Sequence, residues 1–322
     1  MRLFLLVLTA IGSVVWTAPL AAQNYPVRPV RVVIPFAAGG GFDIALRPVL
    51  QKMSENMQQQ FILDMRPGAN GIIGSEIVAK SAPDGYTLLG GGTGTLTINP
   101  NVYAKLPFDT VRDFAPITNC GNASFVMAVH PSVPVRDVKE FIALAKRKPG
   151  ELTYGSPGVG GPNHLGGAYF AQLTGLQMVH VAYKGSLPMI MDLVGGHIQM
   201  VFDSIMQTVP RIRVGHLRAM GIAAPKRSPI APEIPTIAEA GGPEMAIGSW
   251  YGLVAPAGTP RDIIAKLQAE AVKALADPAV RRHYAAIGID PVGSTPEETA
   301  KLIRDDIARF GKVVRAAGIR AQ

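Results

Sequence analysis

The sequence predicts an α/β protein made of two lobes, and three observations support this prediction. Strand-like runs alternate with helical patterns along the chain, which is typical of parallel sheets flanked by helices. Two long extended segments, 113–131 and 249–257, interrupt the alternation and suggest two crossings between lobes. The 300 residues that follow position 22 (322 minus 22) also exceed what one hydrophobic core usually holds.

Three strands and two helices are expected before the first crossing. The runs VRVVIPF, FILDM and YTLLGG have the composition of strands, and they occupy 30–36, 61–65 and 86–91. Helical patterns that begin near 42 and 71 separate them. A second alternating set follows the first crossing, with helices expected at 135–149, 164–175 and 187–196 and strands at 152–156, 178–183 and 198–204.

Two further helices are expected near the C-terminus, each with a Thr-Pro start. In GTPRD, we expect Thr259 to cap the helix and Pro260 to take its first position. In STPEE, Thr295 and Glu298 have the spacing of a capping box. Apolar residues recur at helical spacing behind both starts, so a structural role is expected for these helices.

The two crossings divide the chain into an outer lobe that contains both ends and an inner lobe between them. We expect the outer lobe to comprise residues 23–122 and 244–322, and the inner lobe residues 123–243.

The first 22 residues have the build of a cleaved secretory signal peptide. Arg2 precedes a continuous apolar stretch, and small residues follow at Ala21 and Ala22. The apolar stretch is shorter than the roughly 20 residues that a membrane anchor needs. Cys120 is the only cysteine and lies far from this region, so neither an internal disulfide nor a lipid anchor is expected. We therefore expect export to the periplasm.

The composition argues against a nucleic-acid partner. Hydrophobic residues make up 48% of the chain and charged residues 17%, as in a compact globular protein. The formal net charge of +8 is not gathered in Lys/Arg runs with interleaved aromatic residues. We expect this net positive charge to attract small anions mildly.

Few residues suggest covalent or metal chemistry. The six histidines show no metal-ligand spacing, and the HExxH, G-x-S-x-G and Walker A motifs do not occur. Gly39 and Gly41 could begin a dinucleotide fingerprint, but Ile44 stands where its last Gly or Ala belongs. The sequence therefore predicts neither an enzyme nor a bound metal or cofactor.

Four junctions between a strand and a helix are rich in Gly, Ser and Thr and poor in charge: FAAGGGFD, GGTGTLTIN, GSPGVGGPNHL and YKGSLP. Free N–H groups and the positive end of the helix dipole favour an anion at such junctions. In open α/β sheets, ligands bind at the carboxyl ends of strands, where these loops lie. One such loop could be a simple tight turn, but four of them, two per lobe, predict a cleft for a carboxylate or similar anion.

The first of these loops contains three consecutive glycines. We expect Gly39, Gly40 and Gly41 to let a ligand oxygen reach backbone N–H groups without an intervening Cβ atom. Asp43 would repel an anion if it faced the ligand, so it is interpreted as an early helical residue that fixes the loop or complements the helix dipole.

Several longer stretches also match a known family, in the expected order and over nearly the whole chain after the N-terminal segment. They read YPVRPVRVVIPFAAGGGFD, RPGANGIIGSEIVAKSAPDGYTLL, INPNVYAKLPFD, HVAYKGSLPMIMDLVGGHIQMVFD, LRAMGIAAPKRSPIAPEIPTIAEAG and SWYGLVAPAGTP. In these stretches the chain resembles the periplasmic substrate-binding receptors of tripartite tricarboxylate transporters, often called Bug receptors.

The resemblance implies a type II-like periplasmic binding protein fold, in which each lobe is a mainly parallel sheet flanked by helices and the lobes close on a ligand. It implies that the first two loops of the outer lobe grip a carboxylate and that the inner lobe adds further contacts. Carried onto this sequence, the ligand contacts fall on Phe36, Ala38, Gly39, Gly40, Thr93, Gly94, Thr95, Ser156, His164, Lys184, Gly185 and Asp203.

Five positions leave alternatives open. Ala38 replaces the usual proline of the first loop, which could loosen the turn. Phe42 could form a wall against a flat ligand or pack against its own helix. Asn163 could donate to a second polar end of the ligand or start a helix. Lys184 could bind the ligand or be a solvated turn residue. Asp203 could accept from a water, hydroxyl or ammonium group, or order the backbone.

The function expected is that of a monomeric receptor for a di- or tricarboxylate, an amino acid or an aromatic acid. Hinge closure would capture the ligand, and membrane permease subunits of a tripartite tricarboxylate-type transporter would receive it. Two alternatives stay open: a sensor that signals to a partner, and an enzyme that acts on a carboxylate through His164 and Asp203.

Overall fold

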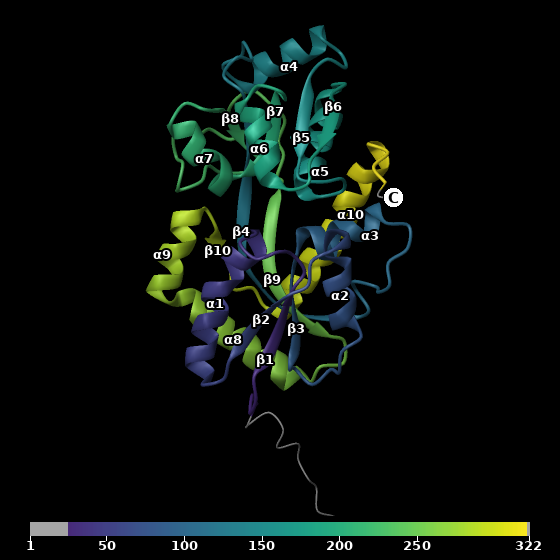
Figure 1. The fold of residues 1–322 in the computed structure, drawn as a ribbon, viewed down its shortest axis with the longest axis vertical. Helices are drawn as coiled ribbons and strands as arrows, with labels where there is room; N and C mark the ends of the chain where they lie inside the picture. Colours follow the sequence, from purple (N-terminus) through teal and green to yellow (C-terminus); the bar gives the residue numbers. More distant parts are fainter. Residues whose placement is uncertain (1–24, 321–322) are drawn as a thin grey trace, which may run out of the picture.

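The computed structural model describes residues 25–320 and has an α/β fold (Figure 1). The expected signal peptide, residues 1–22, lies outside the described residues. The elements fall into two groups joined by two long strands, which confirms the predicted fold class. None of the helices within residues 25–320 combines the length and the apolar character that crossing a membrane requires.

One mixed sheet connects the strands of the described chain. They are β1 (Val30–Ile34), β2 (Phe61–Met65), β3 (Thr87–Gly92), β4 (Phe114–Val129), β5 (Thr153–Ser156), β6 (Val179–Ala182), β7 (Met200–Ser204), β8 (Arg218–Ile222), β9 (Gly248–Pro256) and β10 (Asp290–Pro291). Their order is β2-β1-β3-β9-β4-β7-β5-β6, and β8 and β10 pair with β4.

Each end of this sheet is a parallel unit. β1 is parallel to β2 and β3, and β5 is parallel to β6 and β7. Between these units, β9 runs antiparallel to β3 and β4, and β4 runs antiparallel to β7. The carboxyl ends of each parallel unit therefore carry the loops that lead into the helices of its group.

The strand β4 is the longer of the two crossings. Its residues up to Ser124 pair with β9, whereas those from Phe125 onward pair with β7 and β8. The expected extended segments are thus two adjacent strands that pass from one group to the other (Figure 1). The lobe boundaries stated above remain predictions.

Helices cover both groups. They are α1 (Gly41–Met57), α2 (Ile72–Ala79), α3 (Asn99–Val102), α4 (Val138–Arg147), α5 (Pro162–Thr174), α6 (Ser186–Val194), α7 (Ile205–Arg213), α8 (Arg261–Ala276), α9 (Pro278–Ile287) and α10 (Pro296–Ala316), with the short turns η2 (Ala69–Gly71) and η3 (Thr93–Ile98). In Figure 1, α1, α2 and α8 lie with β1–β3, and α4–α7 lie with β5–β8.

The helix α10 links the two groups by apolar packing. Phe310 and Val313 near its end are buried in the same cluster as Phe141, Phe170 and Phe202, which belong to α4, α5 and β7. Nearer its start, Ile303 is buried in a cluster with Leu96 of η3 and Phe114 of β4. The C-terminal helix therefore packs against elements of both groups.

The two Thr-Pro starts behave differently. The Thr295 hydroxyl accepts from the Glu298 N–H at 3.1 Å, and the Glu298 carboxylate accepts from the Thr295 N–H at 2.9 Å, so the predicted capping box is confirmed. The expected cap at Thr259 is wrong, because its hydroxyl donates to the Pro256 carbonyl at 2.8 Å and closes the preceding turn. Pro260 becomes the N-cap, and α8 begins at Arg261.

Candidate functional site

A cleft of about 680 Å³ lies between the two groups of elements. Each of the four Gly-rich junctions contributes to its wall, and β4, β7, β9 and α7 complete it. The lining residues include Phe36, Gly39, Gly40, Gly41, Phe42, Asn70, Gly94, Gly158, Gly161, Asn163, Lys184, Gly185, Asp203, Ser204, Ser249 and Tyr251. Ala38 also lines the cleft. The structure thus brings loops that are distant in sequence to one place.

The glycine loop between β1 and α1 is built around Asp43. The Gly39 N–H donates to the Asp43 carboxylate at 2.8 Å, and the Gly40 N–H donates to the Ala37 carbonyl at 3.2 Å. Asp43 also forms an ion pair with Arg47, so its interpretation as the residue that fixes the loop is confirmed.

The expectation that Gly39 and Gly40 offer free N–H groups is wrong, because the loop itself uses them. The uncapped donors lie one step later, in the first turn of α1, which has no side-chain cap in the described chain. Gly39 has a φ of 77°, a conformation that favours glycine. A Cβ atom on Gly41 would lie 2.9 Å from the Tyr251 hydroxyl, so this glycine permits a close approach of α1 to β9.

Phe42 both lines the cleft and packs on other aromatic rings. It stacks on Phe36, with ring centroids 4.8 Å apart, and meets Tyr251 edge-on at 5.1 Å. These contacts fix its ring, and all three rings belong to the cleft wall. The two interpretations of Phe42 are therefore compatible.

The second loop contributes Gly94, whereas Thr93 and Thr95 are buried behind the cleft wall. The Thr93 hydroxyl accepts from the Trp250 N–H at 2.9 Å. The Thr95 hydroxyl accepts from the Gly92 N–H at 3.1 Å. Because these hydroxyls are used within the fold, Thr93 and Thr95 shape the loop, and the expected direct contact with a ligand is not supported by their position.

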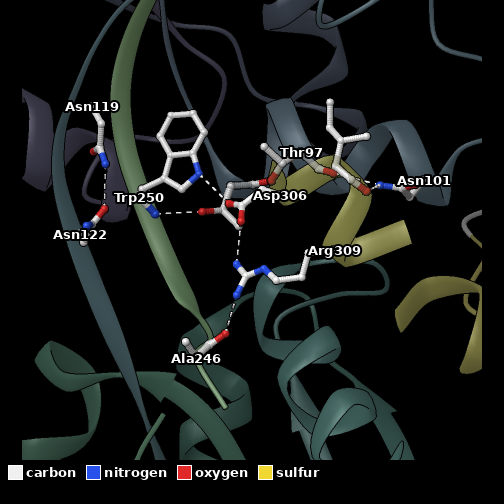
Figure 2. Close-up of polar contacts among 10 residues, drawn as sticks. Thr97, Asn101, Asn119, Asn122, Ala246, Trp250, Asp306 and Arg309 are labelled. Carbon is white, nitrogen blue, oxygen red and sulfur yellow. Dashed lines mark hydrogen bonds and ion pairs between the residues drawn. The ribbon is translucent and has the colours of Figure 1, made fainter. Parts of the chain in front are cut away.

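Trp250 extends this network to α10 (Figure 2). Its indole N–H donates to Asp306 at 3.2 Å, and Asp306 in turn binds Arg309 at 2.7 Å. Arg309 also donates to the Ala246 carbonyl at 2.8 Å, two residues before β9. Burial raises the pKa of Asp306, while Arg309 and the indole lower it. The second loop is thus tied through β9 to α10.

The third and fourth junctions supply the opposite wall. Gly161 is the N-cap of α5, and Gly185, with a φ of 115°, is the N-cap of α6. Lys184 is exposed and is the single Lys or Arg among the cleft-lining residues of the described chain. Both Lys184 and Gly185 lie where a ligand could reach them.

Asn163 and Asp203 form a buried polar pair at the same wall. The Asn163 amide donates to the Phe202 carbonyl and to Asp203 Oδ1, each at 2.9 Å. The Ser204 N–H also donates to Asp203 Oδ1, at 2.8 Å. Burial raises the pKa of Asp203 to about 6, and these bonds oppose the rise. Asn163 therefore both stands in the first turn of α5 and orients the carboxylate.

Ser156 and His164 lie behind the third loop and are not part of the cleft wall. His164 Nδ1 accepts from the Gly160 N–H at 3.0 Å, and the Ser156 hydroxyl donates to the Gly158 carbonyl at 2.7 Å. Burial, followed by the neighbouring His180, lowers the pKa of His164 to about 3. Both residues support the loop from within, so the expected direct ligand contacts are not supported by their position.

Comparison with known proteins shows which family this chain belongs to. Residues 45–319 match the model of the tripartite tricarboxylate transporter family receptor. The chain belongs to this receptor family. It is 34% identical over 304 residues to BugT of Bordetella pertussis, covering 94% of this chain and 93% of that protein.

Solved receptor structures match the fold over nearly their whole length. R. palustris Rpa4515 with adipate gives a TM-score of 0.84 at 34% identity, covering 92% of this chain and 99% of that one. MatC from Rhodopseudomonas palustris with bound malate gives 0.80 at 32% identity, covering 90% and 100%. The periplasmic binding protein BugD gives 0.80 at 28% identity, covering 92% and 100%.

The family and these neighbours are solute-binding receptors and not enzymes, which confirms the expectation that this receptor is not an enzyme. The cleft agrees with that conclusion. Of the two residues that an enzyme would use, His164 accepts a backbone N–H behind the wall, and Asp203 accepts from the Asn163 amide. Within residues 25–320, no group of His, Cys, Asp and Glu side chains could hold a metal ion.

Sequence reasoning missed several residues of the receptor's cleft. Tyr251 and Ser249 lie on the second crossing strand, and Asn70 lies in η2, where its amide donates to the Asn99 side chain at 2.9 Å. Asn70 has a φ of 51°, unusual for a residue other than glycine. The ANG sequence was the available signal for that turn. Crossing strands gave no local signal, because only the fold shows which of their residues face the cleft.

Proposed function

We propose that this receptor captures a small carboxylate in the cleft and delivers it to the membrane subunits of a tripartite tricarboxylate-type transporter. One observation carries the proposal: four helices begin at cleft-lining residues. The N-caps of α1, α5, α6 and α7 are Gly40, Gly161, Gly185 and Ser204. None of these four helices has a side-chain cap in the described chain.

Uncapped helix starts are suited to an anion. Each offers unpaired N–H donors and the positive end of the helix dipole, and a nearby negative charge typically gains about 0.3–1 kcal/mol per helix end. A carboxylate would satisfy donors from both groups of elements at once. The ligands named for the related structures, adipate and malate, are carboxylates, which supports the same chemistry here.

The proposed mechanism is closure around the crossing strands. The pairing partner of β4 changes between Ser124 and Phe125, and the register of β4 with β9 is irregular near Pro116 and Asn119. A ligand that contacts both walls binds the closed state better and therefore shifts the population toward it. We place this receptor in the periplasm, as a monomer, after removal of the first 22 residues.

A ligand screen tests the binding proposal. Small di- and tricarboxylates, amino acids and aromatic acids are added to the purified receptor, with amines of matched size as controls. We expect at least one carboxylate to raise the melting temperature, because a ligand at about 100 times its Kd stabilises the native state by about 2.7 kcal/mol. A screen in which no carboxylate binds would overturn the proposed function.

Delivery and closure need separate measurements. In membrane vesicles that contain the transporter subunits, uptake of the bound acid should require the receptor. Uptake that proceeds equally without it would overturn delivery and favour a sensing role. Small-angle scattering should show a smaller radius of gyration with ligand than without, and an unchanged radius would contradict closure.

A further inference from the structure

Asp203 is the single acidic residue among the cleft-lining residues of the described chain. It is 4% exposed and stands near the end of β7, two residues before α7 begins. A carboxylate is an unexpected lining group in a cleft whose helix ends favour anions. Its two oxygens have different surroundings, and this difference indicates what the cleft selects.

Asp203 Oδ1 has two donors, whereas Oδ2 has none. Oδ1 accepts from the Asn163 amide at 2.9 Å and from the Ser204 N–H at 2.8 Å. Oδ2 is buried and has no hydrogen-bond partner within residues 25–320. A buried acceptor left without a donor costs about 1–3 kcal/mol, and more when it is charged.

The groups around Asp203 do not remove this cost. Arg211, in the last turn of α7, lowers the pKa of Asp203 by its charge, but its guanidinium donates to the Gln207 carbonyl at 2.7 Å. Burial raises the pKa of Tyr251 to about 12, and the charge of Asp203 adds to the rise. Tyr251 thus stays neutral beside Asp203.

We propose that the cleft selects carboxylates that also carry a hydroxyl or an ammonium group, and that Asp203 Oδ2 accepts a hydrogen bond from that group. This inference rests on the proposed function, because the helix N-termini are taken to hold the ligand's carboxylate. A hydroxy acid or amino acid supplies the missing donor. A plain dicarboxylate presents only acceptors to Oδ2, so Asp203 must either repel it or take up a proton.

Calorimetry with ligands of matched carbon skeleton tests the proposal. The sets are succinate, malate and aspartate; glutarate, 2-hydroxyglutarate and glutamate; and benzoate with its hydroxy and amino derivatives. Near neutral pH, we expect the best hydroxy or amino acid of a set to bind at least about tenfold tighter than its plain acid, a difference of about 1.4 kcal/mol. Plain acids that bind as tightly as both derivatives would overturn the proposal.

The isosteric variant Asp203→Asn supplies the sharper comparison. The asparagine amide keeps the shape of the side chain but can donate to a ligand carboxylate. We expect the preference to reverse, with the plain acid of a set gaining affinity and the hydroxy or amino acid losing it. Asp305→Asn, on the exposed face of α10, is the matched control and should keep the wild-type order. An unchanged order in Asp203→Asn would overturn the proposal.

Proton uptake gives a second readout that needs no variant. Binding enthalpies are measured near pH 7.5 in buffers of different ionisation enthalpy, where these ligand carboxyls are already ionised. A plain acid that binds about as tightly as its hydroxy counterpart should take up a proton, because Asp203 must then be neutralised, whereas the hydroxy acid should take up almost none. Similar affinity with equal proton uptake for both acids would overturn the proposal. If acids bind but those with a hydroxyl or ammonium group are not preferred, only this inference is overturned. If no acid binds, the proposed function is overturned as well.

Discussion

The imidazole rings of His164 and His180 stack face to face, with centroids 3.7 Å apart and planes 7° apart. Each ring holds one part of the third loop. His164 Nδ1 accepts from the Gly160 N–H at 3.0 Å, and His180 Nε2 lies 2.7 Å from the Ser156 hydroxyl. Burial lowers the pKa of His164 to about 3 and that of His180 to about 4. Two neutral rings therefore support a loop whose glycines line the cleft.

This pair predicts acid sensitivity of the fold. Because the folded-state pKa values lie below the ordinary value of about 6.5, the unfolded chain binds more protons once the pH falls below that value. Stability is then lost as pH falls through and below about 6.5, by up to about 1.4 kcal/mol per pH unit for a buried histidine such as His164. Urea unfolding near pH 7.5 and pH 5.5 measures the loss.

The variant His164→Phe keeps a flat ring but cannot titrate. It should be less stable than wild type near pH 7.5, because the Gly160 N–H loses its acceptor, yet its stability should depend less on pH. His216→Gln, at an exposed position, is the control and should follow wild type. If His164→Phe and wild type lose stability in parallel on acidification, the histidine pair is not responsible.

A second prediction concerns the tie between α10 and β9. Arg309→Gln removes the charge that faces Asp306 and weakens the bond to the Ala246 carbonyl. Because Arg309 is 41% exposed, the loss of stability should be modest, about 1 kcal/mol or about 2 °C in melting temperature. Ligand affinity should also fall, although Arg309 lies outside the cleft wall, because the second loop is anchored through Trp250.

The matched control for Arg309→Gln is Arg304→Gln, an exposed arginine on the same helix. It should leave both the melting temperature and the ligand affinity at wild-type values. Calorimetry with the acid identified in the screen measures affinity for both variants. Loss of affinity in Arg304→Gln, or wild-type affinity in Arg309→Gln, would contradict a specific role for the tie.

Much of the fold was accessible from the sequence because its signals are local. The run 61–65 is β2 residue for residue, and the long extended segment 113–131 contains β4. The alternation of strand and helix predicts the order of the elements. The capping box predicted at Thr295 is present at the start of α10. At Thr259 the same kind of signal failed, because a turn within the preceding strand end competed for the hydroxyl.

The candidate site was accessible only in part, because hydrogen-bond partners are set by the fold. The sequence located the four loops but could not show that Asp43 would occupy the Gly39 N–H. Nor could it show that His180, on β6, would stack behind the third loop. The start of α7 at Ser204 was missed because its sequence carries no glycine.

A third prediction concerns Lys184, the exposed cation at the cleft. Its charge should attract an anionic ligand at long range, and salt should screen this attraction. Lys184→Gln should therefore weaken binding a few-fold at low ionic strength and much less at high ionic strength. Calorimetry at both salt concentrations measures the difference. Lys226→Gln, a lysine outside the cleft wall, serves as the control. An equal loss at both ionic strengths would point to a direct contact in place of a long-range attraction.

A fourth prediction concerns the start of α1. Gly40, the N-cap, has a φ of −77°, so a valine meets no left-handed strain there, although its Cβ atom would lie 3.1 Å from the Ala37 carbonyl oxygen. The added side chain would stand between the cleft and the first N–H groups of α1. Gly40→Val should therefore abolish the ligand-induced rise in melting temperature while the unliganded protein melts within a few degrees of wild type.

A substitution at the preceding residue of the same loop separates blocking from unfolding. Gly39 has open space around its Cβ position but a φ of 77°, so Gly39→Ala strains the backbone without adding bulk near α1. It should lower the melting temperature of the unliganded protein yet retain a ligand-induced rise. Differential scanning calorimetry with and without the bound acid measures both effects. Because the uncapped helix ends are proposed to hold the carboxylate, wild-type affinity in Gly40→Val would remove α1 from the binding site.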